Sequence, residues 1–138
     1  MNKNLRRVEN IYGNRQDFGI ASFTIDSKND NPKQLKTYAE NLGVFSQNWH
    51  FLTSESESES VFDLANNGFN IFAGINPKVA GGFEHQGYFA LVDKNGFIRS
   101  RMDKFGNPIV YYLGIDQPEL KLQGTDMIIE DIKILLNE

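Results

Sequence analysis

Residues 18 to 25 read Phe18-Gly19-Ile20-Ala21-Ser22-Phe23-Thr24-Ile25, and this short stretch governs how the rest of the chain is interpreted. It carries no charge and is rich in aromatic and branched side chains, which favour strands. A nearly unbroken apolar run of this length is typical of a strand buried on both faces, as in a parallel sheet covered by helices. The run ends at Asp26, where a polar loop begins. The stretch therefore predicts a buried strand.

Helical and extended patterns alternate along the remaining chain. Apolar side chains at helical spacing predict helices over residues 4–12, 32–42, 61–67 and 125–136. Extended apolar runs predict strands at residues 49–52 and 69–75, and residues 88–92 and 97–102 predict a hairpin. This order indicates an α/β fold, with a parallel sheet flanked by helices and an antiparallel hairpin at one edge. We expect one domain over residues 1–138.

Turn and capping residues support these boundaries. Asn31 or Asp30 can cap a helix that has Pro32 at its first position, and Thr125 can cap the last helix. Within the alternating Ser-Glu run of residues 54–60, Ser56 and Glu59 have the spacing of a capping box. The Asn95-Gly96 turn of the hairpin needs a positive φ. Residues 76–87 and 105–123 are expected to be long connections, because both contain several Gly or Pro residues.

The amino-acid composition excludes several classes of function for this chain. The chain has 138 residues, a formal charge of −4 and no cysteine. Without a thiol it has no cysteine nucleophile, disulfide or thiolate metal site of its own, and a thiol peroxidase is excluded. Its mildly acidic balance argues against nucleic-acid binding, which rests on clustered Lys and Arg. No run approaches the roughly 18 apolar residues of a membrane span, and no export signal is visible after Met1.

Two histidines are the candidate metal or catalytic residues. His50 stands inside an apolar strand and is expected to be a packed or edge histidine. His85 follows Gly81-Gly82 in a predicted flexible loop just before a strand, where functional sites are often assembled. One imidazole without partners makes neither a metal site nor a nucleophile pair.

Asp26 is the third candidate residue. It follows the strand at residues 18–25, at the edge where open α/β sheets bind ligands. Asp26 can also cap the turn that follows it, and its spacing alone favours this role over ligand binding.

Several segments carry a family resemblance, and they are Ser22-Phe23-Thr24-Ile25-Asp26-Ser27-Lys28-Asn29-Asp30, Pro32-Lys33-Gln34-Leu35, Asn48-Trp49-His50-Phe51-Leu52-Thr53, the helix at 62–69, Tyr88 to Gly96, and the helix at 128–136. Together, in this order, they resemble the Sco/SenC family, thioredoxin-fold copper proteins of cytochrome c oxidase assembly. The resemblance covers nearly the whole chain and implies a thioredoxin-like sheet. Ser27 stands where the family usually has a proline.

The resemblance also implies a copper site. The family binds copper through a Cys-x-x-x-Cys-Pro motif and one histidine, which corresponds to His85 here. Two thiolates favour Cu(I), and an imidazole accommodates both Cu(I) and Cu(II). Asp26 corresponds to a carboxylate beside the copper ligands rather than to a ligand. The implied partner is the copper-site subunit of cytochrome c oxidase or another copper protein, and the implied location is periplasmic and membrane-associated.

The cysteine motif of the family has no counterpart in this sequence. In relatives the motif is followed by a Met and a helix, which Met1 and residues 5–12 resemble. We therefore expect the cysteines, the strand before them and the membrane anchor to lie upstream, with Met1 an internal methionine or the chain a fragment. That strand would lie between the strands at 18–25 and 88–92, and its absence would leave two unpaired edges. Either the flanking strands close up, or another chain fills the position and makes an oligomer.

The full-length form is therefore expected to deliver copper or to provide thiol-disulfide service during oxidase assembly, as a metallochaperone rather than an enzyme. The alternative is a cysteine-less thioredoxin-like module that binds a partner without redox or metal activity. Tyr111 and Tyr112 in the connection at 105–123 could contribute to such binding. The same connection could equally be a surface loop packed on the fold.

Overall fold

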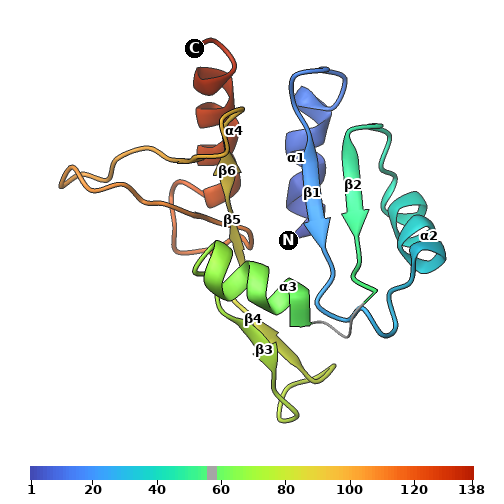
Figure 1. Cartoon of the computed structure of the whole chain (residues 1–138). Coiled ribbons are helices and arrows are strands. Elements are labelled where there is room, and N and C mark those ends of the chain that lie inside the picture. Colours follow the sequence, from blue (N-terminus) through green and yellow to red (C-terminus); the bar gives the residue numbers. More distant parts are fainter. Residues whose placement is uncertain (56–58) are drawn as a thin grey trace. The chain divides into compact units, whose positions relative to one another are not determined.

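The structure, a computed structural model, describes residues 1–55 and 59–138 (Figure 1). These residues divide into two units by their internal packing. The first unit combines residues 1–10 with residues 87–138, and the second comprises residues 11–86. The helix α1 (Asn2–Tyr12) begins in the first unit, and its last two residues belong to the second.

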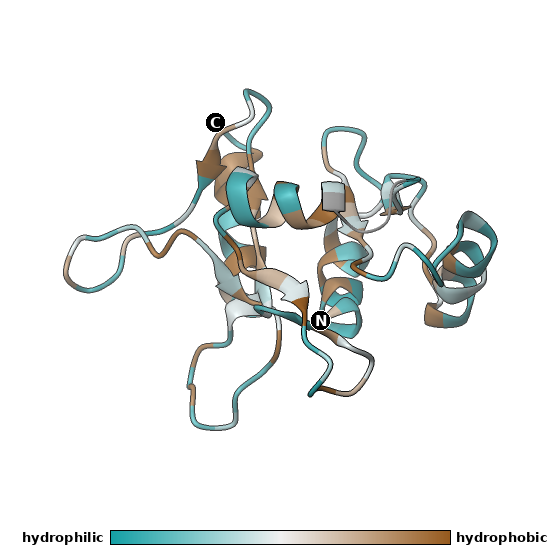
Figure 2. Cartoon of the chain, turned by 60° about the horizontal axis from the view of Figure 1, so that its bottom comes forward, coloured by the Kyte–Doolittle hydropathy of each residue, from teal (hydrophilic) through white to brown (hydrophobic). Residues whose placement is uncertain are grey.

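The second unit is built around a parallel strand pair. The strand β1 (Ile20–Phe23) pairs with β2 (Trp49–Leu52), and the register places Ile20 beside Trp49. The helix α2 (Pro32–Leu42) connects the two strands, as a parallel pair requires. Figure 2 shows hydrophilic and hydrophobic residues on different parts of α2, and Leu35 on this helix is buried. Trp49 is also buried, and its indole N–H donates to the Ser22 hydroxyl at 3.0 Å.

The prediction that this strand is buried on both faces is wrong. Residues of β1 alternate between half-buried and exposed, and the Phe23 side chain is 46% exposed. Alternation of this kind is typical of a strand covered on one face. The apolar composition of residues 18–25 correctly predicted a strand, but it could not report how many layers cover it.

A helical segment and a hairpin complete the second unit. The short helix α3 (Glu59–Asp63) continues into the π-helix η1 (Leu64–Gly68). The strand β3 (Ala73–Ile75) then pairs antiparallel with β4 (Phe83–His85). The predicted loop at 76–87 therefore contains the strand β4. The predicted strand at 69–75 is too long, because residues 69–72 lie outside β3. Ser56 of the predicted capping box lies outside the described residues.

The first unit contains two antiparallel ladders, the helix α4 (Gly124–Leu135) and the residues of α1 up to Asn10. The strand β5 (Tyr88–Phe89) pairs with β8 (Tyr112–Leu113), and β6 (Leu91–Val92) pairs with β7 (Ile98–Arg99). The β6–β7 hairpin is the predicted one, and Gly96 takes the required positive φ of 85°. The helix α4 supplies much of the core. The buried apolar side chains of this unit are Val8, Phe89, Leu91, Tyr112, Ile128 and Ile132.

The predicted cap of the last helix is wrong by two residues. The residue before the first turn of α4 is Gln123, with an extended backbone, and Thr125 lies inside the helix. Gly124 explains the shift. A side chain at position 124 would collide with the Leu113 carbonyl oxygen, so the first residue of α4 has to be a glycine. The sequence around α4 does not reveal this requirement, because Leu113 lies on β8.

The strands of the described residues form four two-stranded ladders rather than one continuous sheet. The sole parallel ladder among them is β1–β2, and no strand of residues 1–55 and 59–138 pairs with the other edge of β1. The α/β class is confirmed by helices α1 to α4 and these ladders.

Candidate functional site

His85 stands at the end of β4, where it pairs with Ala73 of β3. Its side chain is exposed, and its Nδ1 lies 3.1 Å from the Gln86 carbonyl oxygen. When Nδ1 donates to that oxygen, the neutral ring has its lone pair on Nε2 and directs it away from the backbone. His85 can therefore offer one nitrogen to a metal ion.

The setting of His85 differs from the predicted flexible loop. Gly81 and Gly82 both take positive φ angles, of 86° and 78°, and the chain reverses through them. The reversal lets residues 83–85 pair with residues 73–75. Glycine at such positions is equally compatible with a loop and with a tight hairpin, so the sequence alone did not separate the two.

Asp26 follows β1 and is engaged with its own turn. Its carboxylate accepts hydrogen bonds from the Asn29 side-chain amide at 3.1 and 2.9 Å. Its backbone N–H donates to the Thr24 hydroxyl at 3.0 Å. These contacts make Asp26 the cap of the turn that leaves β1, the local role that its spacing favoured.

The described residues do not complete a copper site. Within residues 1–55 and 59–138, no group of three His, Cys, Asp or Glu side chains could hold a metal ion. The chain has no cysteine, so it lacks the soft thiolate ligands that Cu(I) prefers. His85 and Asp26 both belong to the second unit, but the His85 ring contacts Gln86, and Asp26 contacts its own turn. One imidazole is all that the candidate site supplies.

His50 has no comparable setting. It lies on β2 with an exposed side chain, as an edge histidine would. It lines a surface hollow of about 510 Å³ together with residues 16–21 and Asn48. Asp17 on the same hollow is already bound by Arg15, at 2.8 and 2.7 Å. The carboxylate in the lining of this hollow is therefore already paired with Arg15, and a bound ligand would not find it free beside His50.

A pocket of about 520 Å³ lies where β1 and β2 end, and no motif in the sequence indicates it. It is lined by Phe23, Thr53, Ser54, Ser60, Val61, Asp63, Leu64 and Gly68. The Thr53 hydroxyl is buried and has no hydrogen-bond partner in the part of the chain that the structure describes. Ligands of open α/β sheets bind beyond the carboxyl ends of strands, so this pocket has a favourable position.

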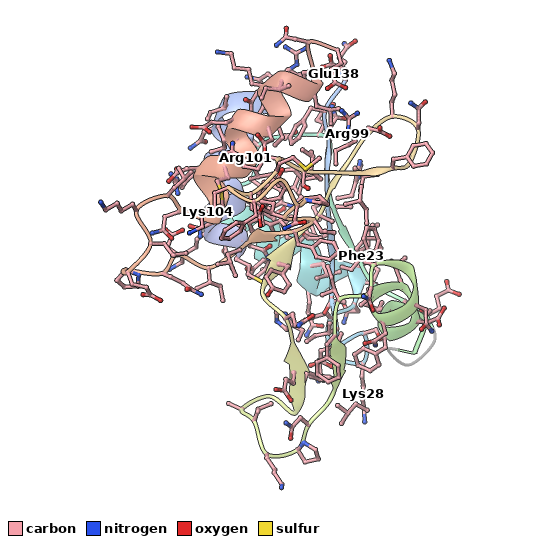
Figure 3. The ribbon with its side chains drawn as sticks, turned by 90° about the vertical axis from the view of Figure 1, so that its left-hand side faces the viewer. Phe23, Lys28, Arg99, Arg101, Lys104 and Glu138 are labelled. Atoms are coloured by element: carbon pink, nitrogen blue, oxygen red, sulfur yellow. The ribbon has the colours of Figure 1, made fainter. Side chains whose placement is uncertain are left out.

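A charged network in the first unit was also missed. Asp131 on α4 accepts hydrogen bonds from Arg101 and, at 2.6 Å, from the Tyr112 hydroxyl. Burial raises the pKa of Asp131, but the hydrogen bonds from Arg101 and Tyr112 outweigh it, and the pKa lies below its ordinary value. Burial and the Asp131 carboxylate raise the pKa of Tyr112. Figure 3 shows Arg101 and Arg99 beside α4, and Arg99 binds Glu138 at 2.8 Å.

The parallel β1–β2 pair with its connecting helix α2, and the antiparallel ladders and helices of the two units, define an α/β protein. The family model described as SCO1/SenC matches residues 1–117. The chain therefore belongs to the SCO1/SenC family.

Individual relatives agree with this assignment. The SCO1 protein homolog of Bacillus subtilis (strain 168) is 38% identical over 90 residues, which are 65% of this chain and 43% of that protein. The chain thus spans less than half the length of that relative.

Two solved structures share the fold. A SCO1/SenC family lipoprotein from Bacillus anthracis str. Ames matches with a TM-score of 0.74 and 22% identity, over 97% of this chain and 70% of its own. BsSco matches with a TM-score of 0.66 and 28% identity, over 95% and 68%. BsSco is described as a member of the Sco family of cytochrome c oxidase assembly proteins and as having a disulfide switch. In the described part of our chain, no helix is long and apolar enough to span a membrane.

Proposed function

We propose that this chain acts in cytochrome c oxidase assembly, in copper delivery or thiol-disulfide service, as part of a Sco-type protein. The match of the SCO1/SenC family model to residues 1–117 carries the proposal. Copper would be the cargo, and the oxidase subunit with the copper site would be its acceptor. The lipoprotein relative from Bacillus anthracis supports a location at a membrane surface.

Within these 138 residues, the contribution to copper handling is one imidazole. His85 is exposed at the end of β4, and its Nδ1 contact with the Gln86 carbonyl leaves Nε2 to face a metal. A single neutral imidazole binds Cu(II) weakly, and Cu(I) needs thiolates that this sequence does not contain. We infer that His85 completes a site whose sulfur ligands come from outside the 138 residues, and that Asp26 acts on the neighbouring turn rather than as a ligand.

Copper titration tests the role of His85. Cu(II) is added to the wild-type chain and to the His85→Ala and His50→Ala variants, which each remove one exposed imidazole. We expect weak Cu(II) binding that His85→Ala reduces and His50→Ala leaves unchanged. An equal loss in both variants would mean that copper binds surface imidazoles without selection.

A second titration tests whether His85 completes a site whose thiolate ligands come from outside the 138 residues. Cu(I) is offered to the chain alone and together with a synthetic peptide that carries Cys-x-x-x-Cys-Pro. The chain alone should leave Cu(I) with a competing chelator, whereas the mixture should hold it more tightly than the peptide does. That gain should vanish with His85→Ala. Tight Cu(I) binding by the unaided wild-type chain would overturn the inference.

A partner-binding module without metal activity is the second candidate, because the connection at 105–123 exposes apolar side chains. Phe105 is 77% exposed, and Ile115 and Leu122 are also exposed. Tyr112 does not belong to this surface, because it is fully buried and bound to Asp131. The expectation that Tyr112 contacts a partner is therefore wrong. Tyr111 stacks on Tyr88, with ring centroids 6.1 Å apart.

Metal dependence separates the two candidates. The copper-site domain of the oxidase subunit is titrated with the metal-free chain and with its Phe105→Ser variant. Binding without metal that Phe105→Ser weakens would favour the partner-binding module. Binding that appears only after copper is added would favour copper delivery.

A further inference from the structure

The ring of His85 is held by the backbone of the residue that follows it. Its Nδ1 lies 3.1 Å from the Gln86 carbonyl oxygen. A carbonyl oxygen only accepts hydrogen bonds, so in the neutral ring this contact places the proton on Nδ1 and the lone pair on Nε2. The position of the Gln86 carbonyl therefore governs which nitrogen of His85 is open to a metal ion.

The hydrogen bonds of the β3–β4 hairpin keep this carbonyl available (Figure 1). The register pairs Ala73 with His85, so Phe72 lies opposite Gln86, and the Gln86 N–H donates to the Phe72 carbonyl at 2.9 Å. In a regular antiparallel ladder such a pair exchanges two bonds, and the Phe72 N–H would donate back to the Gln86 carbonyl. Here the Phe72 N–H donates to the Gln86 side-chain Oε1 instead, at 2.8 Å. The side-chain oxygen thus replaces the backbone oxygen of the same residue as the acceptor.

We propose that Gln86 is a positioning residue for His85. Its side chain accepts from Phe72 in place of its backbone, so its backbone carbonyl accepts the Nδ1 proton of His85 and leaves the Nε2 lone pair directed away from the backbone. The inference rests on the proposed function only in taking copper as the ion that Nε2 binds. The hydrogen bonds themselves involve no metal, so the position of the proton can be measured on the metal-free chain.

A second amide side chain supports the same end of the hairpin and provides a matched control. Because hydrogen-bonded pairs alternate along an antiparallel ladder, the N–H and C=O groups of Ala73 point away from β4. The Ala73 N–H donates to Asn66 Oδ1 at 3.3 Å, and the Ala73 carbonyl accepts from Asn66 Nδ2 at 2.8 Å. Asn66 therefore fastens β3 to η1, whereas Gln86 acts on the carbonyl that His85 uses.

The nitrogen chemical shifts of the imidazole rings test the proposal, because they report which nitrogen carries the proton. Spectra are recorded on the metal-free chain at a pH where both imidazoles are neutral, with His50 as the internal reference. In Gln86→Ala the Phe72 N–H takes the backbone carbonyl as its acceptor, so the tautomer ratio of His85 should shift away from Nδ1–H by about fivefold, the effect of one hydrogen bond. Gln86→Glu keeps an acceptor oxygen for Phe72 and should keep the wild-type ratio. The His50 ratio should be the same in all three proteins.

Urea unfolding separates positioning from structural support. Asn66→Ala should lower the unfolding midpoint and leave the tautomer ratio of His85 unchanged, whereas Gln86→Ala should change the ratio with little effect on the midpoint. Equal ratios in the wild type and Gln86→Ala would overturn the proposal. An equal shift in Asn66→Ala would also overturn it, because the hairpin as a whole would then control the ring.

This test and the test of the proposed function fail separately. The tautomer ratio is measured without metal, so a negative result overturns the role of Gln86 and leaves the copper titrations of His85→Ala as they stand. Conversely, a copper titration that does not depend on His85 would remove the proposed ligand and leave the tautomer result in place. Where both hold, Gln86→Ala should weaken Cu(II) binding, because a smaller fraction of the His85 rings offers the Nε2 lone pair.

Discussion

Arg101 binds Asp131 at two points, with Nε donating to Oδ2 at 2.9 Å and Nη2 donating to Oδ1 at 2.8 Å. Two parallel hydrogen bonds between a guanidinium and a carboxylate fix geometry as well as charge. Asp131 is buried on α4, and Arg101 follows β7. The pair therefore fastens the β6–β7 hairpin to the helix of the same unit.

Replacing Asp131 with Asn should destabilise the protein at neutral pH by about 2 kcal/mol, because Arg101 would lose its charge-assisted hydrogen bonds to Asp131 and keep Glu130, at 2.8 Å, as its counter-charge. The pKa of Asp131 lies below the ordinary 3.8 in the folded state. The carboxylate therefore stabilises the fold above the pKa of the unfolded chain, and this stability is lost as pH falls through the folded pKa. Urea unfolding from pH 7 into the acid range should show the wild type and Asp131→Asn converging. A constant difference over that range would contradict the assigned role.

Tyr112→Phe should cost about 1.5 kcal/mol, since it deletes the hydroxyl that donates to Asp131 at 2.6 Å and leaves the buried ring in place. The matched control is Tyr88→Phe, which keeps the stacking of Tyr88 on Tyr111. Denaturant midpoints of the two variants give the comparison. Equal midpoints would mean that the Tyr112 hydroxyl bond adds nothing to stability.

The sequence predicted those elements whose signals are local. The helix from Pro32 to Leu42 has its capping residues next to it, and the hairpin turn is determined by Gly96. The strand β2 was likewise predicted at residues 49–52. A local signal of this kind acts within a few residues, so it can be recognised without knowledge of what packs against it.

Elements that depend on distant residues could not be predicted in this way. The strand β8 pairs with β5, which lies more than twenty residues earlier in the chain, and β4 needs β3 to be recognised. The Asp131 network joins three segments, and nothing near Asp131 in the sequence indicates Tyr112 as its partner. Of the candidate site, the sequence identified His85 by family resemblance, but the pocket beside Phe23 and Thr53 arises only when β1, β2 and α3 come together.

Asn31→Ala should lower the free energy of unfolding by about 1 kcal/mol, the usual value for loss of an N-cap. The Asn31 side chain accepts from the Gln34 N–H at 3.0 Å, and the Gln34 side chain accepts from the Asn31 N–H at 3.3 Å. Gln34→Ala removes the second bond alone and should cost less. Urea unfolding of both variants tests the order, and a larger cost for Gln34→Ala would contradict the capping box.

Gly124→Ala should be the most destabilising of these small substitutions. A Cβ atom at Gly124 would lie 2.3 Å from the Leu113 carbonyl oxygen and 2.5 Å from the Leu113 nitrogen, and backbone atoms of a paired strand cannot yield as a flexible side chain can. Separating α4 from β8 to relieve this collision should cost about 3 kcal/mol.

The matched control is Gly74→Ala in β3, where the new Cβ would lie 3.5 Å from the Phe72 ring, an ordinary contact. We expect its effect to stay within about 1 kcal/mol, because alanine restricts the unfolded chain more than glycine does. Thermal unfolding of the two variants measures the difference. Similar melting temperatures would show that α4 can move away from Leu113 without loss, and that the close approach of Gly124 to β8 does not hold the helix in place.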